Sequence, residues 1–399
     1  MSKIELIATA TFGLEAVVAR EVKALGYEDM TVENAKVTFT ADEMALCRTN
    51  LWLRTADRVL LKMGSFKATT FEELFQQTKA LPWADWLPRN ANFPVSGKSI
   101  NSKLFSVPDC QAIVKKAVVE KMKSAYKQEW FDEDGPRYAI EVALLKDEVT
   151  LTIDTSGPGL HKRGYRKLTG EAPLKETLAA ALVTLGHWFH DRILMDPLCG
   201  TGTIPVEAAL IGQNIAPGIE RNFAAETWPS VPKAIWQQAR QEALSLEKRD
   251  RKLKIIGTDI NEKALSMARY HAKEAGVEDQ IHFQCMPLSE VRTKSKYGYI
   301  ICNPPYGERL GDNKEVEKLY KEMGQLSRAL DTWSFYVITA HTGFERFFGR
   351  QAARRRKVYN GRIECQYYQY PGPRPPRRLE TDSAERPESP ESENLVPVN

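Results

Sequence analysis

The strongest constraint in this sequence is an alternation of short apolar runs with helical segments that begins near Gly170 and continues to about residue 372. Short apolar runs bounded by polar or glycine-containing turns are typical of strands buried on both faces of a sheet. Five of them occur in this part of the chain: "RILMDP", "KIIGTDI", "IHF", "GYIICNPP" and "WSFYVITA". Strands separated by helices pair in parallel. The segment therefore predicts an α/β fold with a doubly wound, mostly parallel sheet.

Two smaller α+β units are expected before this segment. In the first, "KIELIATA" and "KVTFT" are strand-like, and residues 14–25 form an amphipathic helix that ends at Gly26. In the second, from about Phe66 to Thr155, Asp109 is suited to cap a helix. The runs "RYAIEVALL" and "VTLTID" flank a polar turn and predict a β-hairpin.

Charge and cysteine usage favour a cytoplasmic protein with a mildly basic body. The formal charge of the 399 residues is +4, and the tail from Arg374 holds six acids against four bases, so residues 1–373 carry +6. A basic body permits a polyanionic partner. Residues 373–399 are rich in Pro, Glu and Ser and are expected to be a disordered acidic tail. The six cysteines include no C-x-x-C pair, and we expect neither a signal peptide, a membrane span nor a metal site.

A glycine turn follows the first apolar run in "MDPLCGTGTIPVEAAL". Gly200 and Gly202 would let the backbone approach a ligand closely, and Asp196 at the strand end could meet a cation. Pro205 stands where a dinucleotide fingerprint would have its third glycine, so a ligand with an ammonium and no phosphate is favoured. A tight strand-to-helix connection without any ligand is the alternative.

Asp259 ends the next apolar run, "KIIGTDI". A carboxylate at this place can accept hydrogen bonds from both hydroxyls of a ribose. It lies 57 residues after Gly202, whereas a nicotinamide-binding pattern would place it about 20 residues on, and the excess is an insertion from about Gly212 to Lys252. The other interpretation of Asp259 is a helix N-cap.

The tetrapeptide Asn303-Pro304-Pro305-Tyr306 comes directly after the strand "GYIIC". The Asn303 side-chain oxygen and the Pro304 carbonyl can both accept hydrogen bonds from an exocyclic base amine, which localises the nitrogen lone pair for attack on a sulfonium methyl group. The two prolines stiffen the backbone, and Tyr306 offers a ring on which a base can stack. Cys199 and Cys302 serve as small fillers, because amine methylation requires no thiol nucleophile.

With these motifs in this order, residues 170–372 resemble a class I methyltransferase that uses S-adenosyl-L-methionine (AdoMet) and methylates amines. The resemblance implies a Rossmann-like domain with a seven-stranded sheet, AdoMet as cofactor and S-adenosyl-L-homocysteine as product. It also implies cofactor contacts from Asn303, from the glycine turn and the ribose acid, and from "APLKETLAAAL" beside the methionine part of AdoMet. The residues concerned are Asp196, Pro197, Cys199, Gly200, Thr201, Gly202, Thr203, Asp259, Ile260, Lys175 and Thr177.

The N-terminal half, with "TFGLEAVVAREVKALGY" and "IDTSGPGLHKRGYRK", resembles a ferredoxin-like domain followed by an RNA-binding THUMP domain. This combination is similar to a bacterial family of RNA N2-guanine methyltransferases, which includes the N-terminal methylase of the K/L large-subunit rRNA enzyme. The resemblance implies four parts: a ferredoxin-like domain at 1–65, a THUMP domain at 66–158, the methyltransferase at 159–372 and the tail at 373–399.

We therefore expect an AdoMet-dependent methyltransferase that forms N2-methylguanosine in large-subunit ribosomal RNA. An N6-adenine methyltransferase on DNA or RNA, a tRNA guanine-N2 methyltransferase, and an RNA-binding protein with an unused methylase domain are the alternatives. RNA contacts are expected from basic and aromatic residues of the THUMP-like segment and of "HKRGYRK", namely Lys98, Lys103, His161, Lys162, Arg163, Tyr165 and Arg166. The basic run "RQAARRRK" at 350–357 could add to this surface.

Overall fold

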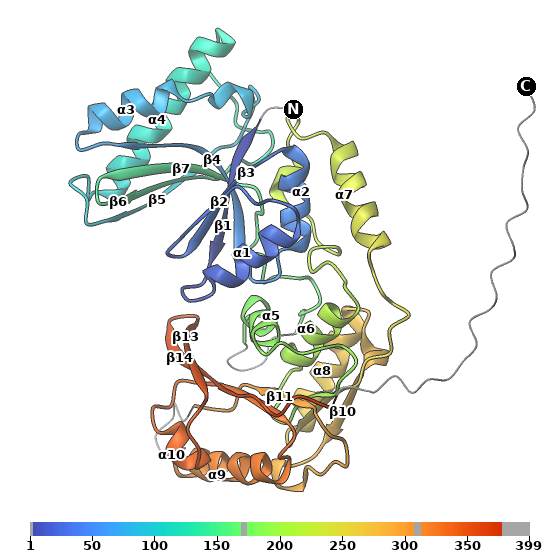
Figure 1. The fold of residues 1–399 in the computed structure, drawn as a ribbon. Helices are drawn as coiled ribbons and strands as arrows, with labels where there is room; N and C mark the ends of the chain where they lie inside the picture. The colour runs from blue at the N-terminus through green and yellow to red at the C-terminus, as the bar shows by residue number, and fades with distance from the viewer. Residues whose placement is uncertain (1–2, 169–173, 307–312, 377–399) are drawn as a thin grey trace, which may run out of the picture.

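The computed structural model divides into an N-terminal unit and a C-terminal unit that lie one above the other (Figure 1). We call the second the methyltransferase unit because its sequence resembles that of a methyltransferase. The structure describes residues 3–168, 174–306 and 313–376. The expected tail thus lies almost wholly outside the described residues. Each unit is built on its own seven-stranded sheet.

One continuous sheet, in the order β2-β3-β1-β4-β7-β6-β5, joins the two expected N-terminal α+β units. The strand β4 is the joint, because it pairs with β1 of the first part and with β7 of the second. The hairpin predicted in the second part is confirmed as β6 and β7. The strands are β1 (Ile4–Ala10), β2 (Met30–Glu33), β3 (Lys36–Ala41), β4 (Ala56–Lys67), β5 (Val95–Ile100), β6 (Ile140–Leu145) and β7 (Glu148–Asp154).

Four helices cover this sheet: α1 (Glu15–Ala24), α2 (Glu43–Trp52), α3 (Phe71–Ala80) and α4 (Val107–Tyr126). The start of α3 is fixed by a capping box, in which the Thr70 side chain and Glu73 exchange hydrogen bonds with each other's backbone N–H groups. The predicted cap of α4, Asp109, was wrong by three residues. Ser106 occupies the N-cap position, and Asp109 lies in the first turn, where its negative charge favours the helix N-terminus.

The second sheet confirms the predicted doubly wound fold. Its order is β10-β9-β8-β11-β12-β14-β13, with parallel pairing from β10 to β12 and antiparallel pairing at β14 and β13. The antiparallel pair was not predicted from the sequence. The strands are β8 (Leu194–Asp196), β9 (Ile255–Asp259), β10 (Ile281–Cys285), β11 (Tyr299–Cys302), β12 (Ser334–Thr339), β13 (Arg354–Asn360) and β14 (Ile363–Tyr370).

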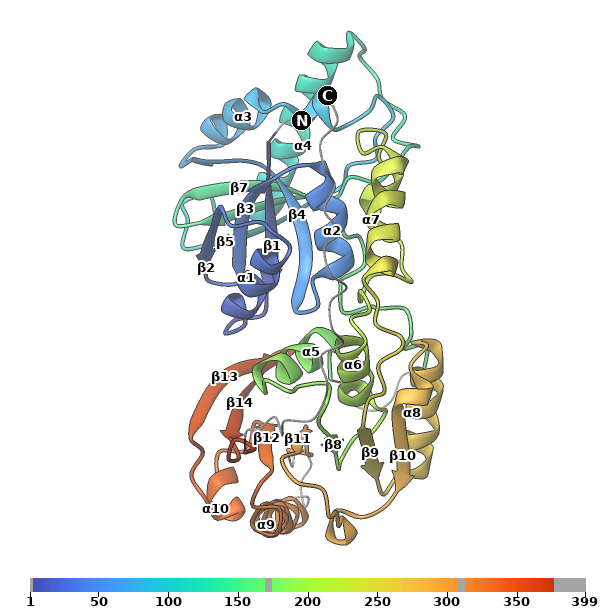
Figure 2. The same ribbon diagram turned by 45° about the vertical axis from the view of Figure 1, so that its right-hand side comes forward.

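Helices lie on both faces of this sheet (Figure 2). On the face nearer the N-terminal unit are α5 (Glu176–Leu185), α6 (Thr203–Gly212) and α8 (Glu262–Glu274), and on the other are α9 (Asn313–Ala329) and α10 (Phe344–Phe348). Separate apolar cores form on the two faces, one under α5 and α6 and the other under α9 and α10. Burial on both faces explains why the central strands β8, β11 and β12 are almost wholly buried and mostly apolar.

The insertion after α6 leaves the methyltransferase unit and packs on the N-terminal one. Its helix α7 (Lys233–Ser245) runs beside α2 (Figure 2). The buried Trp236 of α7 stacks on Phe223 with ring centroids 5.4 Å apart, and Trp228 stacks on Tyr138 of the N-terminal unit at 4.5 Å. The insertion thus completes the apolar core of the N-terminal unit.

A second contact joins the turn between β1 and α1 to strand β13. Arg356 Nη1 donates to Gly13 O at 3.0 Å, and the rings of Phe12 and Tyr359 meet edge to face at 6.1 Å. In the described ranges, no helix combines the length and the hydropathy that a bilayer crossing needs.

Candidate active site

The three predicted motifs meet at the carboxyl edge of the second sheet. The order of strands reverses between β8 and β11, because β9 and β10 lie on one side of β8, and β11 and β12 lie on the other. Asp196 ends β8, Asp259 ends β9, and Asn303 follows β11 directly. Ligands of open α/β sheets bind in the crevice at such a reversal point. The topology therefore brings a buried carboxylate, a second acid and the tetrapeptide predicted to be catalytic to one place.

Asp196 lies in the interior, with 2% of its surface exposed. Its Oδ1 accepts a hydrogen bond from Leu198 N at 3.2 Å. Burial raises the pKa of this carboxyl well above its usual range, and the charge of Asp259 raises it further. A positively charged ligand group beside Asp196 would offset both effects. The site thus fits the ammonium group of AdoMet.

The two glycines of this turn are needed for different reasons. Gly200 and Gly202 both adopt the left-handed conformation, with φ of 51° and 80°. A Cβ on Gly202 would lie 2.9 Å from Ala268 Cβ, so this glycine allows α8 to pack closely. A Cβ on Gly200 would meet nothing within 4 Å, and open space beside this backbone leaves room for a ligand.

The neighbours of these glycines are held by strand β9 and helix α8. Thr258 accepts a hydrogen bond from Cys199 N at 3.0 Å through its carbonyl and donates one to Pro197 O at 3.3 Å through its hydroxyl. The Thr201 carbonyl lies 3.1 Å from Nδ1 of the buried His271. Burial raises the pKa of the Cys199 thiol, which fits its expected place as a small filler and not as a nucleophile.

Asp259 is not the N-cap of α8. Asn261 is the cap, since its side chain accepts hydrogen bonds from the backbone of Lys263 and Ala264. One Asp259 oxygen accepts from Gly200 N at 2.8 Å and the other from Asn261 N at 2.9 Å, which links the acid to the glycine turn. A carboxylate oxygen can accept more than one hydrogen bond, so ribose hydroxyls fit here. The next residue, Ile260, is 73% exposed and presents apolar surface beside this acid.

The tetrapeptide Asn303-Pro304-Pro305-Tyr306, which we predicted to be catalytic, differs in one respect from what we expected. The Tyr306 hydroxyl donates to Asn303 Oδ1, and the Tyr306 ring is half-buried against the core beneath α5 and α6. Burial raises the pKa of Tyr306, which keeps the hydroxyl protonated as a donor. The acceptor on Asn303 is therefore satisfied within the protein, and a substrate amine would have to replace this hydroxyl. Pro304 is buried and Pro305 is exposed.

Residues on α9 and after β12 support this tetrapeptide, and our sequence analysis missed them. The Tyr320 hydroxyl donates to Pro305 O at 2.9 Å and lies 2.9 Å from Thr339 Oγ1 at the end of β12. The ring of His341, two residues further, meets the Tyr320 ring edge to face at 5.4 Å. Thr339 ends the apolar run "WSFYVIT" and His341 lies two residues after it, so the rule that located Asn303 could have located them.

The segment before β8 includes α5, which packs against α6, the helix that follows the glycine turn. Lys175 stands at the N-cap position of α5 and is half-buried, and Thr177 is buried in its first turn. The assignment of these two residues to the cofactor stays a prediction.

The structure corrects the assignment of the linker residues to RNA. Arg163 and Tyr165 are each only 4% exposed, and both donate hydrogen bonds to the buried Glu207 of α6. The guanidinium of Arg166 is likewise engaged inside the protein. Burial lowers the pKa of His161 to about 4, so this residue is neutral at pH 7 and gives no charge to a phosphate. Of the basic residues expected at RNA, Lys98, Lys103 and Lys162 remain exposed.

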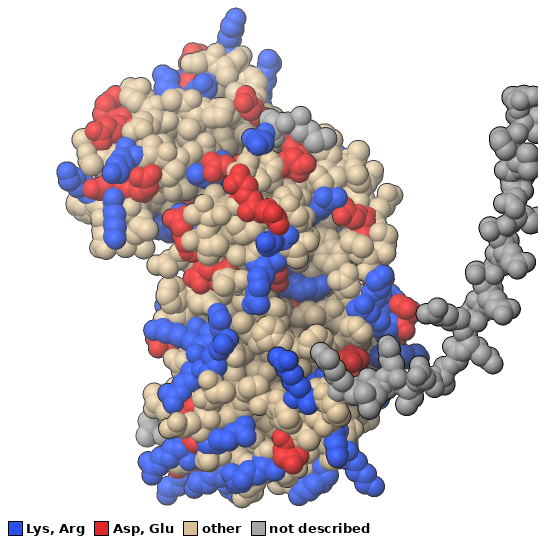
Figure 3. Space-filling model, in the orientation of Figure 1, with Lys and Arg blue, Asp and Glu red and all other residues tan. Residues whose placement is uncertain are grey.

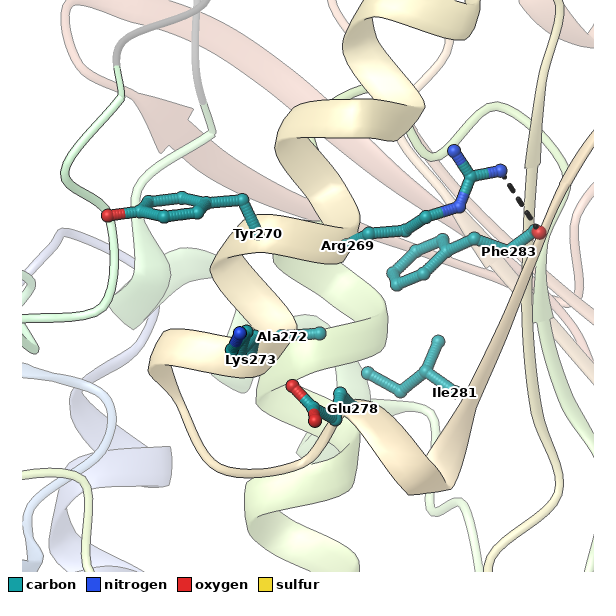
Figure 4. Close-up of a pocket in the computed structure, with 7 residues that line it drawn as sticks. All are labelled: Arg269, Tyr270, Ala272, Lys273, Glu278, Ile281 and Phe283. Atoms are coloured by element: carbon teal, nitrogen blue, oxygen red, sulfur yellow. Dashed lines mark hydrogen bonds between the residues drawn. The ribbon is translucent and has the colours of Figure 1, made fainter.

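A separate hollow of about 420 Å³ lies between α8 and the edge strand β10 (Figure 4). Arg269, Lys273, Glu278 and Phe283 contribute to its walls, and Arg269 reaches the carbonyl of Phe283. No residue of the predicted site lines it. The candidate active site is therefore not this hollow but the carboxyl ends of β8, β9 and β11.

Comparison with protein families assigns three parts of the chain. Residues 5–60 match the RlmL ferredoxin-like domain, residues 68–154 match the THUMP domain, and residues 163–369 match the RMKL-like methyltransferase domain. These ranges lie within the domain limits that the sequence analysis expects, and those limits stay our proposal for the boundaries.

Two relatives show how far the similarity extends. The chain is 52% identical over 386 residues to "Putative RNA methyltransferase YpsC" of Bacillus subtilis, covering 96% of this chain and 100% of that protein. It is 31% identical over 375 residues to "Ribosomal RNA large subunit methyltransferase K/L" of Colwellia psychrerythraea, covering 92% of this chain. The chain spans about half the length of that second relative, 52%.

Solved structures agree with this assignment. A Listeria monocytogenes protein described as a "predicted N6-adenine-specific DNA methylase" is 53% identical, with a TM-score of 0.90 over 94% of this chain and 97% of that one. SMU.472, described as a putative methyltransferase complexed with S-adenosyl-L-homocysteine, is 44% identical, with a TM-score of 0.89 over 94% of this chain and all of that one. The chain therefore belongs to the RMKL-like methyltransferase family, as an AdoMet-dependent enzyme with an RlmL ferredoxin-like domain and a THUMP domain before its catalytic domain.

Proposed function

We propose that this protein methylates the exocyclic N2 amine of a guanosine in large-subunit ribosomal RNA. The observation that carries the proposal is the position of Asn303 at the reversal point of the sheet, beside Asp196, in a chain that also holds a THUMP domain. An amide oxygen at this place suits an amine substrate better than a hydroxyl or a carbon nucleophile, because it accepts an N–H hydrogen without removing it.

AdoMet supplies a methyl group on a positively charged sulfur. Asn303 Oδ1 and the Pro304 carbonyl hold the two hydrogens of the amine, so the nitrogen lone pair points at the methyl carbon. The new nitrogen–carbon bond forms as the carbon–sulfur bond breaks, and its electron pair goes to sulfur. The methylated nitrogen then loses one proton to water, so the site requires no general base.

RNA as the substrate is supported by the charge of exposed surfaces. On the face seen in Figure 3, Lys and Arg gather over the methyltransferase unit, while acidic residues are more frequent over the N-terminal unit. Exposed basic residues of the methyltransferase unit include Arg354, Arg355 and Lys357 of β13. Basic side chains of this kind bind phosphates with little dependence on sequence.

The N-terminal sheet adds a polar hollow of about 730 Å³ near the linker. Arg58, Lys98 and Arg137 line it, together with Glu141 and Asp154. Donors and acceptors in one concave surface suit a nucleotide, which offers both a phosphate and base edges. Ribosomal RNA is favoured over tRNA by the K/L relative, whose described substrate is large-subunit rRNA.

The second candidate is N6-adenine methylation, which the name of the Listeria neighbour favours. The test is a transfer assay with labelled AdoMet and total RNA from a strain that lacks the protein, followed by nucleoside analysis. Labelled N2-methylguanosine in 23S-sized RNA would support the proposal. Labelled N6-methyladenosine, or labelling of DNA but not RNA in a parallel reaction, would contradict it.

A further inference from the structure

The linker between the two units places two arginines and a tyrosine against two glutamates in the protein interior. Arg163, Tyr165 and Arg166 come from the linker, and Glu176 and Glu207 come from α5 and α6. All five are buried or nearly so, and the side chain of Arg166 is 12% exposed. Charged groups removed from water need close partners, so their geometry is informative.

Arg166 joins the beginnings of two helices. Its Nη2 donates to Leu174 O at 2.9 Å, just before α5, and to the hydroxyl of Thr203, the first residue of α6. Its Nη1 lies 3.4 Å from Glu176 Oε1. A planar guanidinium with several donors can hold such partners at once, which a lysine ammonium does less well.

Arg163 and Tyr165 hold the same helix one turn further on. Arg163 Nε and Nη2 lie 3.3 and 3.4 Å from the two oxygens of Glu207, and the Tyr165 hydroxyl donates to Glu207 at 3.1 Å. Arg163 also donates to the carbonyl of Arg54 in the N-terminal unit. The linker therefore ties α6, which begins at the glycine turn, to the N-terminal unit.

The orientation of the cofactor follows from the two acids. The ammonium fits beside Asp196 at the end of β8, and the ribose fits beside Asp259 at the end of the neighbouring β9. Held in this way, the amino-acid end of AdoMet would lie toward β8 and the start of α6, and its adenosine end would lie toward β9 and the exposed Ile260. Arg166 acts at the first of these ends.

We propose that Arg166 is a positioning residue for AdoMet, which holds the starts of α5 and α6 in the arrangement that receives the amino-acid end of the cofactor. The inference rests on the cofactor use in the proposed function, but it does not depend on which base is methylated. It also gives the basic linker a role other than the RNA contact that its charge suggests.

The test compares two ligands that differ only in the amino-acid part. S-adenosyl-L-homocysteine has it, and 5′-methylthioadenosine keeps the adenosine but lacks it. For Arg166→Gln in the full chain, we expect the calorimetric Kd of S-adenosyl-L-homocysteine to rise at least about tenfold, which corresponds to about 1.4 kcal/mol. The Kd of 5′-methylthioadenosine should change less than twofold. In steady-state assays, KM for AdoMet should rise more than kcat falls.

Two further variants make the result specific. Arg166→Lys keeps the charge beside Glu176 without the fork, so its Kd should lie between those of the wild type and Arg166→Gln, and it serves if Arg166→Gln fails to fold. Lys167→Gln is the matched control. Its ammonium pairs with Glu274 at the surface and is 60% exposed, so both ligands should bind as they do to the wild type.

Equal weakening of both ligands, or no weakening of either, would overturn the proposal, since each outcome places the effect of Arg166 elsewhere than at the amino-acid end. These results are separate from the proposed function. If the wild type binds S-adenosyl-L-homocysteine but methylates no guanosine, the base assignment fails while the role of Arg166 is still decided by the two ligands.

Discussion

At the scale of single residues, Asn303 carries the sharpest prediction. In the proposed mechanism its side-chain oxygen accepts a hydrogen bond from the substrate amine, while the methyl donor would be held chiefly at Asp196 and Asp259. Asn303→Ala should therefore lower the methyl-transfer rate by about 10²- to 10³-fold, the usual cost of a lost transition-state hydrogen bond. Binding of S-adenosyl-L-homocysteine should stay within about threefold of the wild type by calorimetry. Asn303→Asp keeps an oxygen acceptor and should retain measurable activity. Loss of cofactor binding in Asn303→Ala would contradict the assigned role.

Asp196 gives a pH dependence whose sign can be stated. Burial raises the pKa of this carboxyl in the free protein, whereas a ligand ammonium favours its ionised form. Binding of S-adenosyl-L-homocysteine should therefore release a proton. Its affinity should increase as the pH rises through the pKa of Asp196 in the free protein, and it should decrease at pH values below that pKa. Calorimetry in two buffers with different ionisation enthalpies measures the released proton. Asp196→Asn should abolish the release, and proton uptake by the wild type would show that the carboxylate does not face the ammonium.

At the scale of elements, helix α7 makes part of the methyltransferase chain necessary to the N-terminal unit. Trp236 is 3% exposed and stacks on Phe223. Trp236→Ala should lower the free energy of unfolding by about 3–5 kcal/mol, as large aromatic deletions in cores do. Trp130 is 78% exposed, and Trp130→Ala should change the free energy of unfolding by less than about 0.5 kcal/mol. Urea unfolding followed by circular dichroism compares the two. Similar small effects would mean that α7 only rests on the surface.

The elements also show what the sequence could and could not predict. Strands β8, β9 and β11 were predictable because apolar runs end in polar motifs at the sheet edge. Strand β13 was not, because its run of basic residues at 354–357 resembles a solvated surface, and it lies at the edge of the sheet. Arg163 was misassigned for a related reason. A basic side chain has the same letter whether it meets a phosphate or a buried Glu207, and only the fold reveals the partner.

At the scale of the whole molecule, the contact between the two units can be tested with two glycines. Gly13 has a φ of 90°, and a Cβ there would lie 2.4 Å from Lys357 O of β13. Gly26 has a φ of 93° but would meet nothing within 4 Å. Gly26→Ala should cost about 1–2 kcal/mol through backbone strain alone. Gly13→Ala should cost more and should speed proteolysis between the units. If the two cost the same in thermal unfolding, the turn at Gly13 does not hold the units together.

Because strand β4 is shared by its two parts, the N-terminal unit would act as a molecular ruler between bound RNA and Asn303. The ferredoxin-like and THUMP parts are hydrogen-bonded into one sheet, and α7, Gly13 and the linker attach that sheet to the methyltransferase unit. An RNA segment bound to the N-terminal unit would therefore lie at a fixed distance from Asn303. Such an enzyme would select its nucleotide by the distance of that nucleotide from the bound RNA segment. Consider two transcripts that present the same base in the same short sequence. They would be methylated at different rates if the RNA feature bound by the N-terminal unit lay one helical turn nearer to that base in one of them.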